Sequence, residues 1–155
     1  MRPFFAYSPS ARPLVLLACS GTKLDRPAKA IELYKGVMYT TLAKHQSADA
    51  PPNVLILSAE HGFVSPDSVI APYNRRMTVM RADEMLSDLG RFNTHAAWPR
   101  EIGKAFLAGG AESRRVMWAM LAALYPEAVP FAGETSGGIG QQRAQLGAFL
   151  RAAYR

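Results

Sequence analysis

The sequence predicts a single three-layer α/β/α domain built on a mainly parallel sheet of about four strands. Short, continuous apolar runs alternate with longer segments of helical periodicity, in the order β-α-β-α-β-α-β-α. The apolar runs lack polar alternation, which is typical of strands buried on both faces. The length of 155 residues, with 49% hydrophobic and 19% charged residues, fits one ordinary globular domain. We expect residues 1–12 to be a flexible leader and residues 13–155 to form the domain.

The first half of the chain supplies two of the predicted strands. Residues 13–18 (PLVLLA) form the first apolar run, and residues 53–59 (NVLILSA) form the second. Residues 28–46 predict a helix between them, which Gly36 weakens or splits because glycine is a poor helix former. Two consecutive prolines then separate this helix from the second strand.

The second half of the chain supplies the remaining elements. Residues 64–80 are expected to form a loop, and Asp83 is expected to cap a helix over residues 82–92. The pattern then predicts a helical stretch at 98–102, a strand at 103–109, a helix at 111–125, a strand at 128–132 and a helix at 141–154. Pro130 suggests that the fourth strand lies at an edge of the sheet, since proline cannot donate to a ladder.

The segments that follow the predicted strands carry most of the polar residue types used in catalysis and phosphate binding. These segments are residues 19–23, 60–62, 109–112 and 133–141. Right-handed crossovers place the loops after parallel strands at one edge of the sheet, where open α/β sheets bind their ligands. We therefore expect the functional groups at that edge.

Composition limits the location and the partners of the protein. The formal charge of +6 and the pI near 9.8 favour polyanions such as nucleic acid, or phosphorylated small molecules, although such a charge can also serve solubility alone. The lone Cys19 cannot form an internal disulfide, which favours the cytoplasm. Pro3, Arg12 and Pro13 interrupt the N-terminal apolar segment, so we expect neither a signal peptide nor a membrane partner. The oligomeric state stays open.

Cys19 begins the loop after the first strand. A thiolate there could attack an electrophilic carbon if a nearby cation lowered its pKa, whereas a buried cysteine usually acts as a small hydrophobe. Lys23 follows a turn of small residues, whose backbone amides could hold a phosphate or carboxylate together with its ammonium group. Those small residues are Ser20, Gly21 and Thr22. The alternative for Lys23 is an ordinary solvated surface lysine.

Glu60, His61 and Gly62 follow the second strand. A carboxylate and an imidazole could supply general acid-base catalysis, although neighbouring side chains point in different directions. Gly62 allows a sharp turn or a close approach to a ligand. The alternative is structural: His61 would bind a backbone carbonyl and Glu60 would pair with an arginine.

The long loop after the second strand contains Tyr73, Asn74, Arg75 and Arg76. Tyr73 could stack on a base, and the arginines and Asn74 could contact phosphate or other polar groups of a nucleotide. The same composition also fits an ordinary exposed loop.

A glycine-rich segment precedes the last predicted helix. Gly138, Gly140 and Gln141 lie where free amides at a helix N-terminus would attract an anion, although a simple loop fits equally well. The three histidines are dispersed and no CxxC or HExxH spacing occurs, so we expect no metal site and no cofactor.

Four separated motifs, taken in order, resemble the family of unknown function DUF6884. They lie in the stretches LLACSGTKLDRPAKAIELYKG, VLILSAEHGFVSPDSVIAPYN, AGGAESRRVMWAML and GGIGQQRAQL. Members of that family typically read CSxTK, SAxxGL, PxxxIxPYD and GIGQQ. This chain departs from the pattern at Phe63, where leucine is frequent, and at Asn74, where aspartate is frequent. Asparagine binds but cannot act as a base, so a catalytic role carried by that aspartate is in doubt here.

The CSxxK start is more distantly similar to the core of archaeosine synthase and to the YaaA-like peroxide-stress proteins. The former modifies a deazaguanine base in transfer RNA, the latter are associated with DNA, and genes of the family occur in phages and mobile elements. The resemblance therefore implies nucleic-acid or nucleobase chemistry. It maps onto Cys19, Ser20, Thr22, Lys23, Glu60, His61, Gly62, Tyr73, Gly138, Gly140 and Gln141.

The leading hypothesis is an enzyme that modifies a nucleobase or nucleoside within nucleic acid. Cys19, or a water activated by Glu60, would attack the substrate, while Lys23 would stabilise negative charge and His61 would move a proton. One alternative is a nucleic-acid-binding protein without catalysis. Another is an enzyme that acts on a free nucleotide or sugar phosphate.

Overall fold

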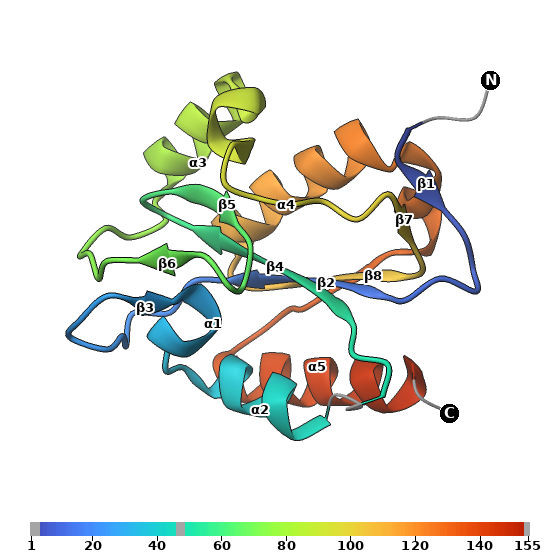
Figure 1. The fold of residues 1–155 in the computed structure, drawn as a ribbon, viewed down its shortest axis with the longest axis horizontal. Coiled ribbons are helices and arrows are strands. Elements are labelled where there is room, and N and C mark those ends of the chain that lie inside the picture. The colour runs from blue at the N-terminus through green and yellow to red at the C-terminus, as the bar shows by residue number, and fades with distance from the viewer. Residues whose placement is uncertain (1–3, 46–48, 154–155) are drawn as a thin grey trace.

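The protein is an α/β domain in which helices cover both faces of one central sheet (Figure 1). The structure is a computed structural model and describes residues 4–45 and 49–153. The strands are β1 (Ala6–Tyr7), β2 (Leu14–Ala18), β3 (Ala28–Lys29), β4 (Asn53–Ser58), β5 (Gly62–Val64), β6 (Val69–Ile70), β7 (Glu101–Ile102), β8 (Ala105–Ala108) and β9 (Gly133–Glu134). The α-helices are α1 (Ala30–Leu33), α2 (Val37–His45), α3 (Val79–Ser87), α4 (Ala111–Leu124) and α5 (Ile139–Ala153), and the 3-10 helices are η1 (Leu89–Asn93) and η2 (Pro126–Phe131).

The central sheet has the strand order β5-β4-β2-β8-β9. Strands β4, β2, β8 and β9 run parallel to one another, whereas β5 pairs antiparallel with β4. The expectation of a mainly parallel sheet of about four strands was therefore wrong in detail, because the sheet is mixed and has five strands. The short turn between β4 and β5 is the reason: a parallel connection needs a crossover of a dozen or more residues, so the chain reverses as a hairpin.

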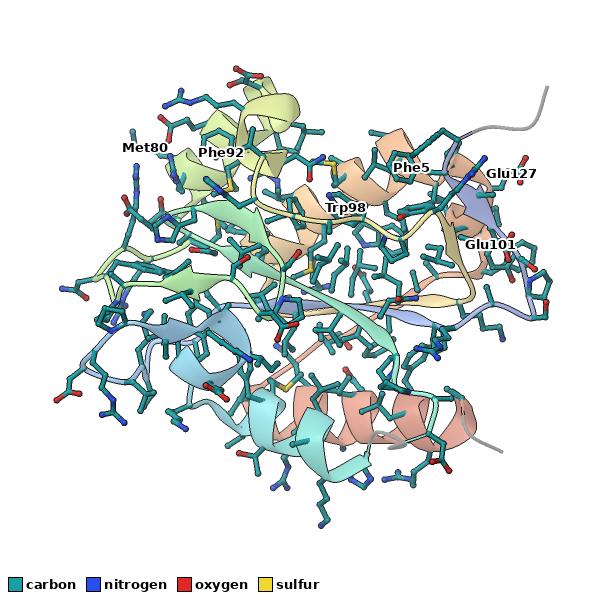
Figure 2. The ribbon with its side chains drawn as sticks, viewed as in Figure 1. Phe5, Met80, Phe92, Trp98, Glu101 and Glu127 are labelled. Carbon is teal, nitrogen blue, oxygen red and sulfur yellow. The ribbon has the colours of Figure 1, made fainter. Side chains whose placement is uncertain are left out.

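The apolar strands bury both of their faces, as their sequences predict. Leu14 and Leu16 of β2 pack with α3 and α4 side chains on one face, while Val15 and Leu17 pack with α2 and α5 on the other. Figure 1 shows α3 and α4 on one side of the sheet and α2 and α5 on the opposite side. Figure 2 shows Phe92 and Trp98 on the α3–α4 side, where the Trp98 ring lies 5.2 Å from that of Phe63. The predicted strands at 13–18, 53–59 and 103–109 and the helix at 111–125 correspond to β2, β4, β8 and α4.

The expected helix over residues 28–46 is divided. A short strand, β3, precedes α1, and α1 is separated from α2 around Gly36, as glycine permits. Gln46 lies outside the described residues. The segment at residues 64–80 was expected to be a loop, but it contains the end of β5, strand β6 and the first turn of α3.

Thr78, rather than Asp83, caps α3. The Thr78 Oγ1 accepts a hydrogen bond of 3.1 Å from the Arg81 backbone N–H, so the helix begins before the predicted residue 82. Asp83 instead forms an ion pair of 2.7 Å with Arg115 on α4. The predicted single helix also ends early, because the chain passes from α3 into the tighter η1.

Two other local predictions were wrong. The stretch at 98–102 is not helical, and its last two residues form strand β7, which pairs in parallel with β1. The stretch at 128–132 lies largely in η2 instead of a strand, because Pro126 and Pro130 fix the backbone torsion and remove two donors that a ladder would need. The last sheet strand is β9, next along the chain.

The last helix begins at Ile139, two residues before the predicted start at residue 141, and Tyr154 lies outside the described residues. Near the other end of the chain, Ala6 and Tyr7 pair with β7 inside the segment that we expected to be a leader. Gln142, Leu146 and Leu150 form the buried face of α5 at intervals of four residues, so Gln142 rather than Gln141 points inward.

Candidate functional site

The loop that follows β2 lies at the carboxyl edge of the sheet between the ends of two other strands. Ala18 is in register with Leu57 of β4, and Leu17 is in register with Ala108 of β8. The Cys19 backbone N–H continues this pairing, because it donates a hydrogen bond of 3.0 Å to the Leu57 carbonyl. Cys19 therefore lies between the segments after β4 and β8, as the parallel pairing of these strands requires.

Internal hydrogen bonds fix the shape of this loop. The Ser20 Oγ donates to the Thr22 carbonyl at 2.6 Å, and the Lys35 backbone N–H donates to the same carbonyl at 2.9 Å. Gly36 lies against the loop, since a Cβ at that position would be 3.0 Å from the Ser20 Cβ. The segment from Cys19 to Lys23 is therefore held by the residues that join α1 to α2.

Two adjoining hollows flank the loop and share Cys19, Ser20 and Gly21 as lining residues. The larger has a volume of about 590 Å³, and the smaller has a volume of about 360 Å³. Both volumes fall within the range of small-molecule sites. The larger hollow is completed by Thr22, Lys35, Gly36, Val37, Met38, Tyr39, Ala108, Gly109, Ile139 and Gln142. The smaller is completed by Lys23, Asn74, Arg75, Arg76, Met77 and Ser113, and Ala18 and Gly110 border both.

The two hollows differ in charge. The smaller one is lined by the cationic side chains of Lys23, Arg75 and Arg76 and by no acidic residue among those described. The larger one has Lys35 at its lining and otherwise neutral groups, among them Met38 and Tyr39. A ligand with an anionic part and a flat or apolar part would therefore find matching surroundings on either side of the Cys19 loop.

A buried network of hydroxyl groups lies beneath Lys23. The Ser58 Oγ donates to the Tyr73 hydroxyl at 2.9 Å, and the Tyr73 and Tyr34 hydroxyls share a hydrogen bond of 2.6 Å. Ser58 also accepts the backbone N–H groups of Glu60 and His61, at 3.2 and 3.0 Å. The network thus joins β4, the turn that follows it, the loop before α3 and the end of α1.

Lys23 lies over the aromatic rings of this network. Its Nζ is 4.6 Å from the centre of the Tyr73 ring and 5.8 Å from that of Tyr34, which are cation–π distances. Burial raises the pKa of the Tyr34 phenol to about 12, although hydrogen bonds from Ser58 and Tyr73 oppose the rise. Burial also raises the pKa of the Tyr73 phenol. Both phenols are therefore neutral near pH 7, and they can donate protons in hydrogen bonds but not act as bases.

The Glu60 carboxylate lies in a chain of ion pairs. It is 3.8 Å from an Arg75 nitrogen, and another Arg75 nitrogen is 3.6 Å from Glu84. Arg81, which is only 7% exposed, also pairs with Glu84 and donates to the carbonyls of Ala59, at 2.7 Å, and Glu60, at 3.0 Å. Arg81 therefore fixes the turn that carries the Glu60 side chain, and Glu60 in turn orients Arg75 at the smaller hollow.

His61 and Gly62 contribute to the same turn. The His61 ring lies edge-on to the Tyr73 ring, with centres 5.6 Å apart. Gly62 has a φ of 78°, and a Cβ there would be 2.3 Å from the Phe92 carbonyl oxygen. Neither Glu60 nor His61 lines either hollow in the part of the chain that the structure describes. The turn therefore supports Tyr73 and Arg75, which both contact it.

The family model of DUF6884, described as a family of unknown function, matches residues 14–147. The chain belongs to this family. The DUF6884 match begins at the first residue of β2, extends into α5 and includes every residue that lines the two hollows. The search of curated proteins gave no match, and neither did the search of solved structures.

In this DUF6884 member the candidate residues Gly138, Gly140 and Gln141 lie at the start of α5 and line neither hollow. Gly138 and Gly140 are exposed, and the Gln141 Oε1 accepts a hydrogen bond of 3.2 Å from the Gly138 backbone N–H. Their neighbours Ile139 and Gln142 line the larger hollow.

Sequence reasoning missed several groups of the site. Gln142 and Thr135 are buried at the rear of the larger hollow, where the Thr135 Oγ1 accepts the Gly109 backbone N–H at 3.0 Å and contacts the Gln142 Oε1 at 3.3 Å. The apolar spacing could have identified Gln142, which lies four and eight residues before Leu146 and Leu150 on the same face of the helix. Ser58 begins the SAxxG motif but was not singled out, and Tyr34 and Tyr39 lie outside the four family motifs; they enter the site because α1, α2 and β4 converge there.

Metal and membrane signals are both missing from the described residues. Residues 4–45 and 49–153 contain no group of three or more His, Cys, Asp or Glu side chains arranged to hold a metal ion. Within the same ranges, no helix combines the length and apolar character needed to cross a bilayer.

Proposed function

We propose that this protein is a cytoplasmic enzyme that modifies a nucleobase or nucleoside of nucleic acid, with Cys19 at its reacting centre. The main support is the placement of Cys19 between a cationic hollow and a mostly neutral one. A nucleotide has the same division, because its phosphate is anionic and its base is flat and uncharged. The formal charge of +6 suits a polyanionic substrate as well.

In this proposal the smaller hollow binds phosphate. Lys23, Arg75 and Arg76 supply the positive charge, and Asn74 adds an uncharged polar group beside them. Tyr73 acts as a positioning residue, because its ring supports the Lys23 ammonium group and its hydroxyl is bound by Ser58 and Tyr34. Glu60 positions Arg75 through their ion pair.

The base occupies the larger hollow, between Tyr39 and Met38 on one side and the end of β8 on the other. There the Cys19 thiolate can add to an electrophilic carbon of the base: the new C–S bond forms as a ring double bond breaks, and its electron pair moves to a neighbouring ring atom, which takes up a proton. A base held in a duplex must be turned out of the stack to reach this position, so we expect single-stranded substrates to bind more readily.

Because Cys19 is the only cysteine of the chain, its alkylation measures access to the site directly. Iodoacetamide labelling followed by mass spectrometry would be run with and without a single-stranded oligonucleotide or a mononucleotide panel. We expect oligonucleotides to slow labelling, and we expect Lys23→Met to weaken this protection about tenfold. Arg26→Met, a change of equal charge on an exposed residue outside both hollows, is the control.

The outcomes separate the three functional hypotheses. Protection by oligonucleotides together with loss of product formation in Cys19→Ser supports the proposed enzyme. Binding that survives in Cys19→Ser with no product detected from any oligonucleotide would favour a non-catalytic nucleic-acid-binding protein. Protection by mononucleotides alone would favour an enzyme acting on a free nucleotide.

A further inference from the structure

The helix pair α2 and α5 forms a face that carries only positive charge. The two helices pack side by side on one face of the sheet (Figure 1), and neither sequence contains an aspartate or glutamate. Their basic groups come from Lys44 and His45 on α2 and from Arg143 and Arg151 on α5. Such a one-sided distribution differs from a surface in which both signs are interspersed.

A groove of about 450 Å³ runs between these helices, and all four basic side chains line it. Gly147 forms part of its floor. A Cβ at Gly147 would be 3.2 Å from an Arg151 guanidinium nitrogen and 3.5 Å from the His45 ring, so both side chains lie close above this glycine. The groove therefore concentrates several positive groups in a concave site, which strengthens the local field.

Several cations on the opposite face of the sheet lie in ion pairs. Arg81 pairs with Glu84, and Arg115 pairs with both Asp83 and Glu112. Within residues 4–45 and 49–153, the side chains of Lys44, Arg143 and Arg151 have no ion pair. A bound polyanion would reduce the mutual repulsion of these side chains and be attracted by them.

The groove adjoins the candidate site. Val37, the first residue of α2, lines both the groove and the larger hollow beside Cys19. From Val37 to His45 the helix extends roughly 12 Å at its usual rise per residue. A flexible polyanion with its end group in the hollow could therefore extend along the groove.

We propose that the α2–α5 groove binds the sugar–phosphate backbone of a single-stranded nucleic acid whose reacting base occupies the hollow beside Cys19. The inference rests on the proposed function and adds the surface along which the backbone of the substrate polymer binds. A membrane surface fits less well, because helices that bind lipid present Trp, Phe or Leu beside their cations, and the groove lining contains no such residue among those described.

The test compares two double variants with the same change of charge. Arg143→Gln with Arg151→Gln removes two groove cations, whereas Arg26→Gln with Lys29→Gln removes two cations from the exposed segment that leads into β3. All four side chains are exposed, so we expect both variants to fold. Binding of a fluorescein-labelled single-stranded oligonucleotide is followed by fluorescence anisotropy over a series of salt concentrations.

For the groove variant we expect affinity to fall at least about tenfold and the slope of log K against log salt to decrease in magnitude by about 1.4, since each phosphate contact contributes about 0.7 for single strands. The control variant should keep the parent slope within about 0.3. Equal slopes for the two variants would overturn the groove proposal. Co-sedimentation with phosphatidylserine vesicles in the absence of oligonucleotide binding would overturn it too.

Labelling of Cys19 separates this proposal from the proposed function. If the groove variant binds oligonucleotides like the parent and Cys19 is still protected, the groove proposal fails and the proposed function stands. If the groove variant loses binding and no nucleotide or oligonucleotide protects Cys19 in the parent, the groove binds nucleic acid without serving the proposed enzyme site.

Discussion

The hydroxyl groups of Tyr34 and Tyr73 lie 2.6 Å apart although 39 positions separate the two residues along the chain. This contact connects the end of α1 with the loop before α3, directly beneath the Lys23 ammonium group. The Ser58 hydroxyl joins the same network from β4. The network therefore fixes the relative positions of three segments that border the Cys19 loop.

Tyr73→Phe is expected to lower the free energy of unfolding by about 1–2 kcal/mol, because the buried Tyr34 and Ser58 hydroxyls each lose a partner. Urea unfolding followed by circular dichroism measures the change. Tyr7→Phe is the matched control: within the described residues the Tyr7 hydroxyl has no hydrogen bond, and its ring contact with Phe131 is retained. Equal losses in the two variants would contradict a stabilising role for the network.

The buried tyrosines predict a loss of stability in alkali. The pKa of Tyr34 is raised to about 12 in the folded protein, above the value near 10 in an unfolded chain. Below about pH 10 both states hold the proton and stability is unaffected, while above it the unfolded chain loses its proton first. The free energy of unfolding should then fall by up to about 1.4 kcal/mol per pH unit for this group until about pH 12.

Urea titrations at several values between about pH 9 and pH 12 would measure this dependence. Burial also raises the pKa values of Tyr39 and Tyr125, so these tyrosines add to the loss in the same direction. A free energy of unfolding that stays constant over this range would show that the phenols are not shielded from water as described.

Gly62→Ala is expected to destabilise the protein by at least about 2 kcal/mol. An alanine would have to keep a φ of 78°, and its Cβ would meet the Phe92 backbone carbonyl at 2.3 Å. Gly90→Ala is the control, because a Cβ at that position has nothing within 4 Å. Thermal unfolding of both variants would show the difference, and a similar melting temperature for the two would argue against the tight turn.

Arg81→Met is expected to cost about 2–3 kcal/mol, since it leaves the Ala59 and Glu60 carbonyls without their guanidinium donors. Arg91→Met is a close control, because Arg91 stacks on the same Phe92 ring at 5.2 Å, yet is exposed. We expect the control to change stability by less than about 0.5 kcal/mol. If Arg81 positions Glu60 and Arg75, its replacement should also weaken oligonucleotide protection of Cys19 under conditions where the variant is folded.

The buried strands could be predicted from sequence because a continuous apolar run such as LVLLA has one stable environment, between two layers of helices. Short edge elements could not. The apolar run around Val129 resembles a strand, but two prolines make it a 3-10 helix, and Glu101 and Ile102 form a strand only because β1 lies beside them. Pairing between distant segments leaves no local pattern that a sequence window can detect.

The candidate site was predictable to the same extent. Cys19 and Lys23 follow β2 at the carboxyl edge of the sheet, Arg75 lies in the loop before α3, and the structure brings all three to the smaller hollow. Gln141 was named because it ends the glycine-rich segment, whereas Gln142, which lies four residues before Leu146 on the buried face of α5, was not singled out. Tyr34 and Ser58 depend on tertiary contacts, so their contribution became visible only in the folded chain.

Gly36, which lies between α1 and α2, packs against Ser20 and so helps to set the size of both hollows. Any side chain there would press on Ser20 and displace the segment that both hollows share, so one substitution would resize two compartments together. Met38 lines only the larger hollow and Met77 only the smaller one, so substitutions at these positions would change the volume of one hollow at a time. An engineered change of substrate preference should therefore begin at the methionines and leave position 36 untouched.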